Sequence, residues 1–225
     1  NQENKIKLND QLSNLKMDVS IILLFCSTVT ILTLSPGPDI IFVISQSLQI
    51  GYKYGVKISL GLVTGLFIYT IASSFGLSWV LDQFPNVSSL IKIVGAFYIG
   101  FLAYEEFPKK GIIKLKEPIN NKNNPFFTGL IMNLSNPKIM LFFVSLFPQF
   151  VFHNNWPIKY QFLILGIVFI IIAFLIFSLV SVLSYFLIKK PFSNFNHKYF
   201  SYLSCFVLGS ISVLLFVSEI KNIFE

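Results

Sequence analysis

The chain has 225 residues, of which 54% are hydrophobic and only 12% are charged, and its mean hydropathy is +0.72. Soluble domains carry about twice that share of charged residues, so the composition excludes an ordinary soluble protein and predicts an integral membrane protein. All 17 basic residues are lysines, most of them in polar tails and connections and not on one face, so the net charge of +7 indicates membrane topology and no nucleic-acid partner.

Residues 1–17 form a polar tail before the first apolar run. The tail is too polar for a signal peptide, and the run after Met17 ends in Ser-Pro-Gly-Pro instead of a small-x-small cleavage site. We therefore expect no cleavage. Met17 is a candidate for the natural start of the protein, and we assign the tail no function.

Six apolar runs follow, and each can supply the roughly 20 residues that a membrane helix needs. The only long polar connection, 105–125, divides them into two groups of three and is expected to be a linker. The sequence thus predicts an all-α integral membrane protein with six transmembrane helices, in a first three-helix repeat at 18–104 and a second at 126–225. The runs are 18–50, 57–80, 87–104, 126–152, 158–188 and 199–220.

Lysine is unevenly distributed among the connections. The first, third and fifth connections carry ten lysines, whereas the tails and the remaining connections carry five, with Lys92 and Lys138, inside the third and fourth runs, left out. Lysine-rich loops stay on the cytoplasmic side of a membrane. We therefore expect both termini outside and the 105–125 linker in the cytoplasm, in a multi-pass protein of the plasma membrane, which is the inner membrane of a bacterium.

The first apolar run is interrupted at LTLSPGPDIIFV, residues 32–43. The helical pieces on either side would be about 25 and 18 Å long, so neither alone crosses a hydrocarbon core of about 30 Å. The interruption must therefore lie within the membrane, where irregular backbone is tolerated only if it is buried in protein or lines a wet cavity.

The residues of this first break are Ser35, Pro36, Gly37 and Pro38, followed by Asp39. The prolines remove backbone donors, and the glycine is expected to take unusual backbone angles between them. The simpler alternative is a proline kink that serves helix packing. We favour a functional break, because two prolines, a glycine and an ionisable residue coincide at one depth.

The fourth run repeats this pattern in GLIMNLSNPKIMLFFVSLFPQF, residues 129–150. Placing Pro38 against Pro137 aligns Asp39 with Lys138. Three spans in each half make the halves enter the membrane from opposite sides, so the repeat is inverted and its first and fourth helices are broken. Paired interrupted spans in inverted halves indicate a transporter with a site near the middle of the membrane.

Proline fits the first turn of a helix, so Pro38 and Pro137 are expected to open the second half of each broken span. Asp39 then lies at the favourable, positive end of a helix, whereas Lys138 lies at an unfavourable one and needs an anion. That anion is Asp39 when the site is empty, or a substrate carboxylate when it is full. The structural alternatives are a permanent ion pair that holds the broken helices together, or a lysine that extends to an interface.

The stretch LSPGPDIIFVISQSLQIGYKYGVKISLGLVTG resembles the first two spans of the LysE (lysine exporter) family of amino-acid exporters, including its homoserine and threonine branch, and FFTGLIMNLSNPKIMLFFVSLFPQF resembles the fourth. The resemblance covers nearly the whole chain from Met17. It implies efflux of small amino acids or related compounds, driven by a proton or other ion gradient. The absence of arginine and the polar tail depart from a typical member. The residues carried over as those of the broken helices are Pro36, Gly37, Pro38, Asp39, Asn136, Pro137 and Lys138.

We therefore expect alternating access around a site between the first and fourth spans. Lys138 and the amide groups near Asn136 would bind the α-carboxylate, with Gly37 in the same site. Asp39 would bind the α-ammonium and carry the proton if protons drive export. The expected partners are the amino acid, the coupling ion and membrane lipids, without a cofactor.

Two other classes of membrane protein are alternatives to an amino-acid exporter. A divalent-cation exporter of related architecture would need several intramembrane carboxylates or thiols, and only Asp39 is clearly internal. A membrane enzyme would need a nucleophile with a base, or a metal centre, within the apolar spans. The sequence shows neither, so we expect no catalytic site and no metal site.

Some residues carry weaker signals. Gly61 and Gly65 lie one turn apart, which indicates close helix packing first and a homodimer contact or a gate second. Tyr69 and Tyr98 are interpreted as core or interfacial tyrosines before substrate ligands. Glu105 is interpreted as a solvated carboxylate at the cytoplasmic edge.

Overall fold

The computed structural model describes residues 19–35, 37–105, 107, 124–153 and 156–187, with single residues and pairs between 202 and 217. The polar tail, most of the linker and most of the predicted sixth span lie outside these ranges. Within them the chain is helical and has no strand. After a helix at Val19–Leu34, the elements are α2 (Pro38–Gln49), α3 (Tyr52–Ala72), the π-helical η1 (Ser73–Leu77), α4 (Ser78–Gln83), α5 (Pro85–Glu105), α6 (Pro125–Leu134), α7 (Pro137–Leu141), the π-helical η2 (Phe142–Leu146), the 3-10 helix η3 (Phe147–Phe150) and α8 (Ile158–Leu187).

Two described stretches are long and apolar enough to cross a membrane alone: Tyr52–Gln83, which joins α3, η1 and α4, and Ile158–Phe186 in α8. Two bent pairs qualify when each is taken as one span. The helix Val19–Leu34 and α2 are bent by 54°, and α6 and the α7–η3 segment by 51°. These match the predicted first, second, fourth and fifth spans. The 21-residue α5 covers the residues of the predicted third span. The all-helical, multi-pass character is confirmed, whereas the inverted repeat stays a prediction.

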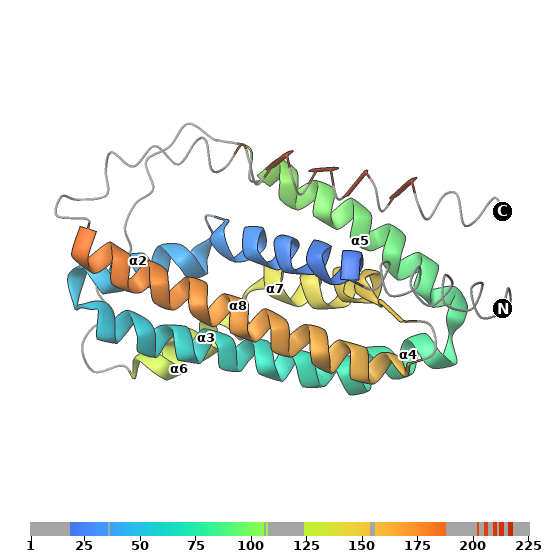
Figure 1. Ribbon diagram of the computed structural model, residues 1–225, viewed down its shortest axis with the longest axis horizontal. Coiled ribbons are helices and arrows are strands. Elements are labelled where there is room, and N and C mark those ends of the chain that lie inside the picture. The colour runs from blue at the N-terminus through green and yellow to red at the C-terminus, as the bar shows by residue number, and fades with distance from the viewer. Residues whose placement is uncertain are drawn as a thin grey trace, which may run out of the picture.

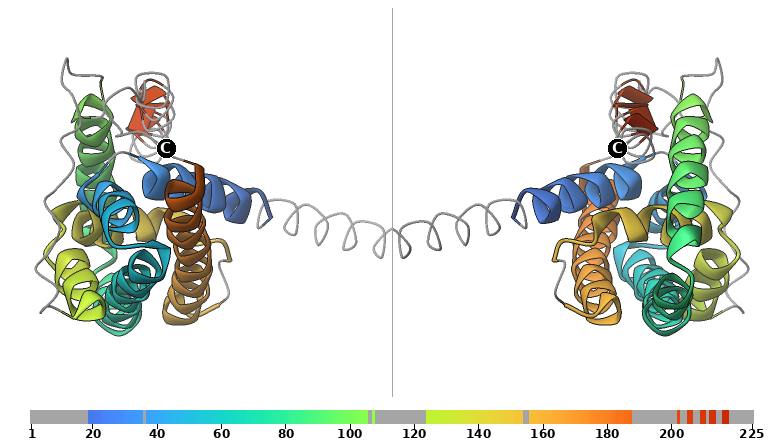
Figure 2. Two further views of the ribbon diagram at one scale, coloured as in Figure 1. Left: turned by 90° about the vertical axis from the view of Figure 1, so that its left-hand side faces the viewer. Right: turned by 90° about the vertical axis from the view of Figure 1, so that its right-hand side faces the viewer.

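The helices form one bundle, in which α3 and α8 run side by side along its length (Figure 1). The views along that length show α3 between α6 and α8 (Figure 2). The α2–α3 connection, the start of α6 and the end of α8 lie at the left-hand end in Figure 1, whereas α4 and the start of α8 lie at the other end. At least one helix end beside each of the three lysine-rich connections therefore lies at the left-hand end of the bundle, which agrees with the predicted topology.

Helices α3 and α6 approach each other closely enough for backbone contact. A Cβ atom at Gly61 would overlap the carbonyl oxygen of Phe126 and lie 2.8 Å from the amide nitrogen of Leu130. On the other side of the contact, a Cβ atom at Gly129 would overlap the carbonyl oxygen of Ile58. Membrane helices associate through such close packing, because lipid tails are as apolar as the side chains. The packing interpretation of Gly61 is confirmed.

Phenylalanine rings fill the space around the second half of the fourth span. Phe25 of the first span packs edge-on against Phe150, and Phe142 packs edge-on against Phe169 of α8, with ring centroids 5.1 Å apart in both pairs. The backbone is irregular here because Pro148 has no amide hydrogen for the carbonyl four residues earlier, and the chain passes through η2 and η3. Ring packing across three spans therefore holds this half-span in place.

We expect Gly61→Ala to destabilise the protein, because the added methyl group would push α3 away from the backbone of α6. The free energy of unfolding should fall by about 1–3 kcal/mol, as for overpacking of a tight contact. Gly76→Ala is the matched control, since a Cβ atom there meets nothing within 4 Å. Thermal melting of the purified protein in detergent measures both, and an unchanged midpoint for Gly61→Ala would contradict the prediction.

Candidate functional site

The first break lies between the helix Val19–Leu34 and α2. The Ser35 amide still donates to the Ile31 carbonyl at 2.8 Å, as in a helix, and α2 then begins at Pro38. At this position the missing donor of proline costs nothing, because the first amides of a helix have no intrahelical partner. Pro36 lies outside the described residues. The break is therefore a short non-helical connection between two half-helices, in which the Gly37 amide donates to the Ser35 carbonyl at 2.6 Å.

Gly37, in the middle of this break, has φ −107° and ψ 178°. Any residue adopts this extended conformation, so the expectation that Gly37 takes glycine-specific backbone angles is wrong. A Cβ atom at this position would lie 3.8 Å from Nζ of Lys138. This distance is an ordinary van der Waals contact, so a small side chain would also fit beside the lysine ammonium group.

The second break lies between α6 and α7, which begins at Pro137. Asn136 caps α7 by accepting a hydrogen bond from the Lys138 amide at 3.0 Å. This cap takes that amide away from the Leu134 carbonyl, its partner in a continuous helix. The Tyr69 hydroxyl, from α3, donates to the same carbonyl at 2.9 Å. Since an unpaired carbonyl is costly within a membrane, Tyr69 stabilises the break.

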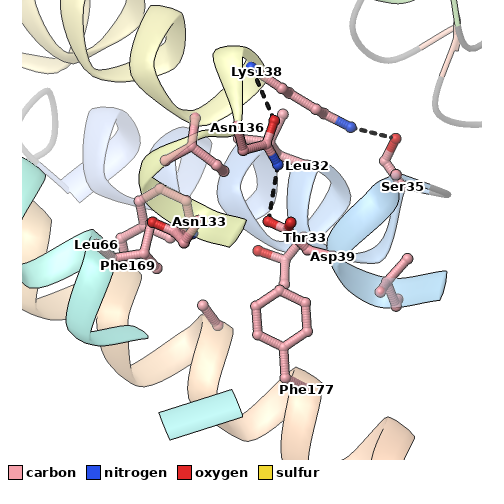
Figure 3. A pocket seen from close by; sticks show the side chains of 14 residues that line it. Leu32, Thr33, Ser35, Asp39, Leu66, Asn133, Asn136, Lys138, Phe169 and Phe177 are labelled. Atoms are coloured by element: carbon pink, nitrogen blue, oxygen red, sulfur yellow. Dashed lines mark hydrogen bonds between the residues drawn. The ribbon is translucent and has the colours of Figure 1, made fainter. Parts of the chain in front are cut away.

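Two hydrogen bonds join the breaks across about 100 residues of sequence (Figure 3). Nδ2 of Asn136 donates to Oδ2 of Asp39 at 2.9 Å, and Nζ of Lys138 donates to Oγ of Ser35 at 2.9 Å. Asp39, Asn136 and Ser35 are all buried. The structure therefore places the polar groups of both broken spans face to face inside the bundle.

Asn136 is oriented by its two partners. The Lys138 amide can only donate, so Oδ1 of Asn136 must face it, and Nδ2 is left to face the Asp39 carboxylate. Asp39 also lies in the first turn of α2, where the helix dipole stabilises a negative charge. One asparagine thus caps one half-helix and stabilises the carboxylate on the other. The predicted Asp39–Lys138 ion pair stays a prediction.

A small cavity of about 20 Å³ lies where the two breaks meet α3 and α8. Its polar lining includes Asp39 and two residues that the sequence analysis did not single out, Thr33 and Asn133. Asn133 is only 1% exposed, and its Oδ1 has no hydrogen-bond partner among the described residues. Leu66 and Phe169 close the apolar side. The volume suits about one water molecule, which could donate to Asn133.

A large cavity of about 500 Å³ lies on the other side of the breaks, against α5. Gly37, Asn136 and Lys138 line both cavities, whereas Asp39 is part of the small cavity's lining. Small-molecule sites usually occupy about 300–1,000 Å³, so the large cavity has room for an amino acid and the small one does not. The breaks therefore separate a space of substrate size from a space of water size.

Most of the predicted site residues come together in this structure. Their role in substrate binding stays a prediction. The sequence could have indicated Asn133, because a polar side-chain amide four residues before an intramembrane proline is unusual. The bond of Tyr69 to a backbone carbonyl had no signal in the sequence. The residues brought together at the breaks are Ser35, Gly37, Pro38, Asp39, Asn136, Pro137 and Lys138.

Comparison with known proteins gives one family and several relatives. The family model described as LysE type translocator matches residues 30–219. The homoserine/homoserine lactone efflux protein of Salmonella typhimurium is 31% identical over 153 residues, which cover 67% of this chain and 74% of that protein. The uncharacterized membrane protein YrhP of Bacillus subtilis is 30% identical over 167 residues, which cover 69% and 79%. No solved structure matches.

We expect Tyr69→Phe to lower the free energy of unfolding by about 1 kcal/mol, because the Leu134 carbonyl loses its hydrogen-bond donor. Tyr104→Phe is the control, since the Tyr104 side chain is 72% exposed. Melting of both variants in the same detergent separates the lost bond from the general effect of removing a hydroxyl. Equal midpoints for the two variants would show that Tyr69 does not stabilise the break.

Proposed function

Because the chain belongs to the LysE type translocator family, we propose that it is a secondary transporter that exports a small amino acid or a derivative across the plasma membrane, driven by the proton gradient. The name of its Salmonella relative points to homoserine and homoserine lactone as first candidates for the substrate. The observation that carries the proposal is the pair of hydrogen bonds that joins the two breaks inside the bundle.

We also propose that the chain forms two inverted three-helix repeats with six spans. Three observations support this arrangement. The two broken spans bend by similar angles, 54° and 51°. Pro38 and Pro137 open the second half-helix of each span. Finally, the α2–α3 connection, the start of α6 and the end of α8, which form or flank the lysine-rich connections, share one end of the bundle (Figure 1).

In the proposed mechanism, substrate binding replaces contacts that the breaks now make with each other. Lys138 would release Ser35 and bind the substrate carboxylate, which is the stronger, charged acceptor. Asp39 would exchange its bond with Asn136 for the substrate ammonium or for a proton. Each exchange loosens the attachment of one broken span to the other, so occupancy of the site is coupled to rearrangement of the broken helices.

The alternative, a divalent-cation exporter, is less well supported by the residues at the breaks. Divalent cations are usually held by several carboxylates, thiols or imidazoles. Among the described residues no group of three or more such side chains could hold a metal ion. The small cavity offers one carboxylate, from Asp39, together with neutral oxygens. Transport of a metal remains an outcome that the experiment below would detect.

The test is export of a panel of labelled amino acids, beginning with homoserine, into everted membrane vesicles with and without a pH gradient. We expect accumulation that depends on the gradient. Asp39→Asn should lower the flux by about tenfold or more, the loss expected for one charged hydrogen bond, and should remove its dependence on the gradient. Asp82→Asn is the control, since Asp82 is exposed at the end of α4 and lines neither cavity.

Two results would contradict the proposal. Gradient-dependent export that is unchanged in Asp39→Asn would remove Asp39 from the proton path. Vesicles that accumulate none of the amino acids, but accumulate a divalent metal, would favour the alternative function.

A further inference from the structure

The large cavity contains an acidic group that the mechanism above does not use. Tyr98, Phe101, Leu102 and Glu105 of α5 line it, at positions i, i+3, i+4 and i+7. This spacing places all four on one face of the helix. That face forms the wall opposite the two breaks. The cavity is therefore bounded by α5 on one side and by Lys138 with its neighbours on the other.

The charges of this cavity match those of an amino acid. Lys138 supplies a cation, and Glu105 is the only carboxylate among the described residues that line it. Between them the lining is largely apolar, with Phe101, Leu102 and Leu141. An amino-acid zwitterion presents one carboxylate, one ammonium group and a side chain. The cavity thus offers a partner of the right kind for each part, in a volume of substrate size.

Asp39 cannot serve this role in the present conformation. It is 6% exposed and lines the small cavity, which has room for about one water molecule. A substrate in the large cavity would meet Lys138 but would need another carboxylate for its ammonium group. Glu105 is exposed at the last residue of α5, next to the linker that we expect in the cytoplasm, so it is accessible to a substrate that arrives from that side.

We propose that the large cavity is the receiving site for the amino acid on its way out of the cell, and that Glu105 binds its ammonium group while Lys138 binds its carboxylate. This inference rests on the proposed function. The substrate is first held between α5 and the breaks. Its ammonium group then passes from Glu105 to Asp39 when the broken helices rearrange. Glu105 is a binding residue for the inward-facing state and not a solvated carboxylate without a role.

The experiment measures initial rates of uptake into everted vesicles, where the cytoplasmic face is outside, over a range of concentrations of the best substrate. We expect Glu105→Gln to raise KM by about tenfold to a hundredfold, the range expected for loss of a hydrogen bond between charged groups, with little change in the maximal rate. Glu105→Asp, which keeps the charge, should restore most of the affinity. Asp82→Asn, which removes an exposed carboxylate outside the cavity, should leave KM unchanged.

A competition arm identifies the substrate group that Glu105 binds. The unlabelled amino acid should inhibit uptake of the labelled substrate less strongly in Glu105→Gln than in the unmodified protein. Its deaminated hydroxy-acid analogue, which keeps the carboxylate, should compete equally in both. Parallel weakening of both competitors would overturn the assignment of Glu105 to the ammonium group.

The outcomes separate this inference from the function on which it rests. Vesicles with the unmodified protein that take up no amino acid would overturn the proposed function and the receiving site together. Active vesicles in which Glu105→Gln leaves KM unchanged would overturn the receiving site alone. A rise in KM that Glu105→Asp does not reduce, at an unchanged melting temperature, would overturn the role of the charge.

Discussion

The organising constraint of this protein is the cost of unpaired polar groups within a membrane. Each broken span exposes backbone groups that a continuous helix would pair internally, and each carries an ionisable side chain. The Asn136 side chain pairs polar groups on both broken spans. It caps α7 through the Lys138 amide and donates to the Asp39 carboxylate on the other broken span. Neither break could be buried in this form alone, so the two interrupted spans depend on each other.

The surrounding helices make this mutual dependence possible. The Tyr69 hydroxyl donates a hydrogen bond to the Leu134 carbonyl, which the second break leaves without its helical partner. Tyr69 reaches that carbonyl because α3 lies directly against α6. The close approach of these helices in turn requires glycine at Gly61 and Gly129, where any side chain would overlap the opposing backbone. A feature of packing, far from any charge, therefore positions a hydrogen bond that the polar site needs.

Sequence reasoning located the breaks, because proline and glycine within an apolar run have strong local effects. It also placed Pro38 and Pro137 at the start of half-helices. It erred at Gly37, whose backbone is in an extended conformation that any residue can adopt. It did not predict that Asn133 lines the small cavity or that Glu105 and Lys138 line the same large cavity. Such pairings depend on which helix faces meet, which no local pattern in the sequence encodes.

The position of Asn136 between the two cavities suggests how the site could respond to a substrate. It lines both cavities, and its side chain is held by Asp39 on one side and by the α7 amide on the other. In the proposed mechanism, an ammonium group that reaches Asp39 from the large cavity would compete with the Asn136 amide, because both bind the same carboxylate. Displacement removes a bond between the broken spans. In this proposal, the contact between the two broken spans is also the contact with which the substrate competes, so substrate binding would weaken the attachment of one span to the other.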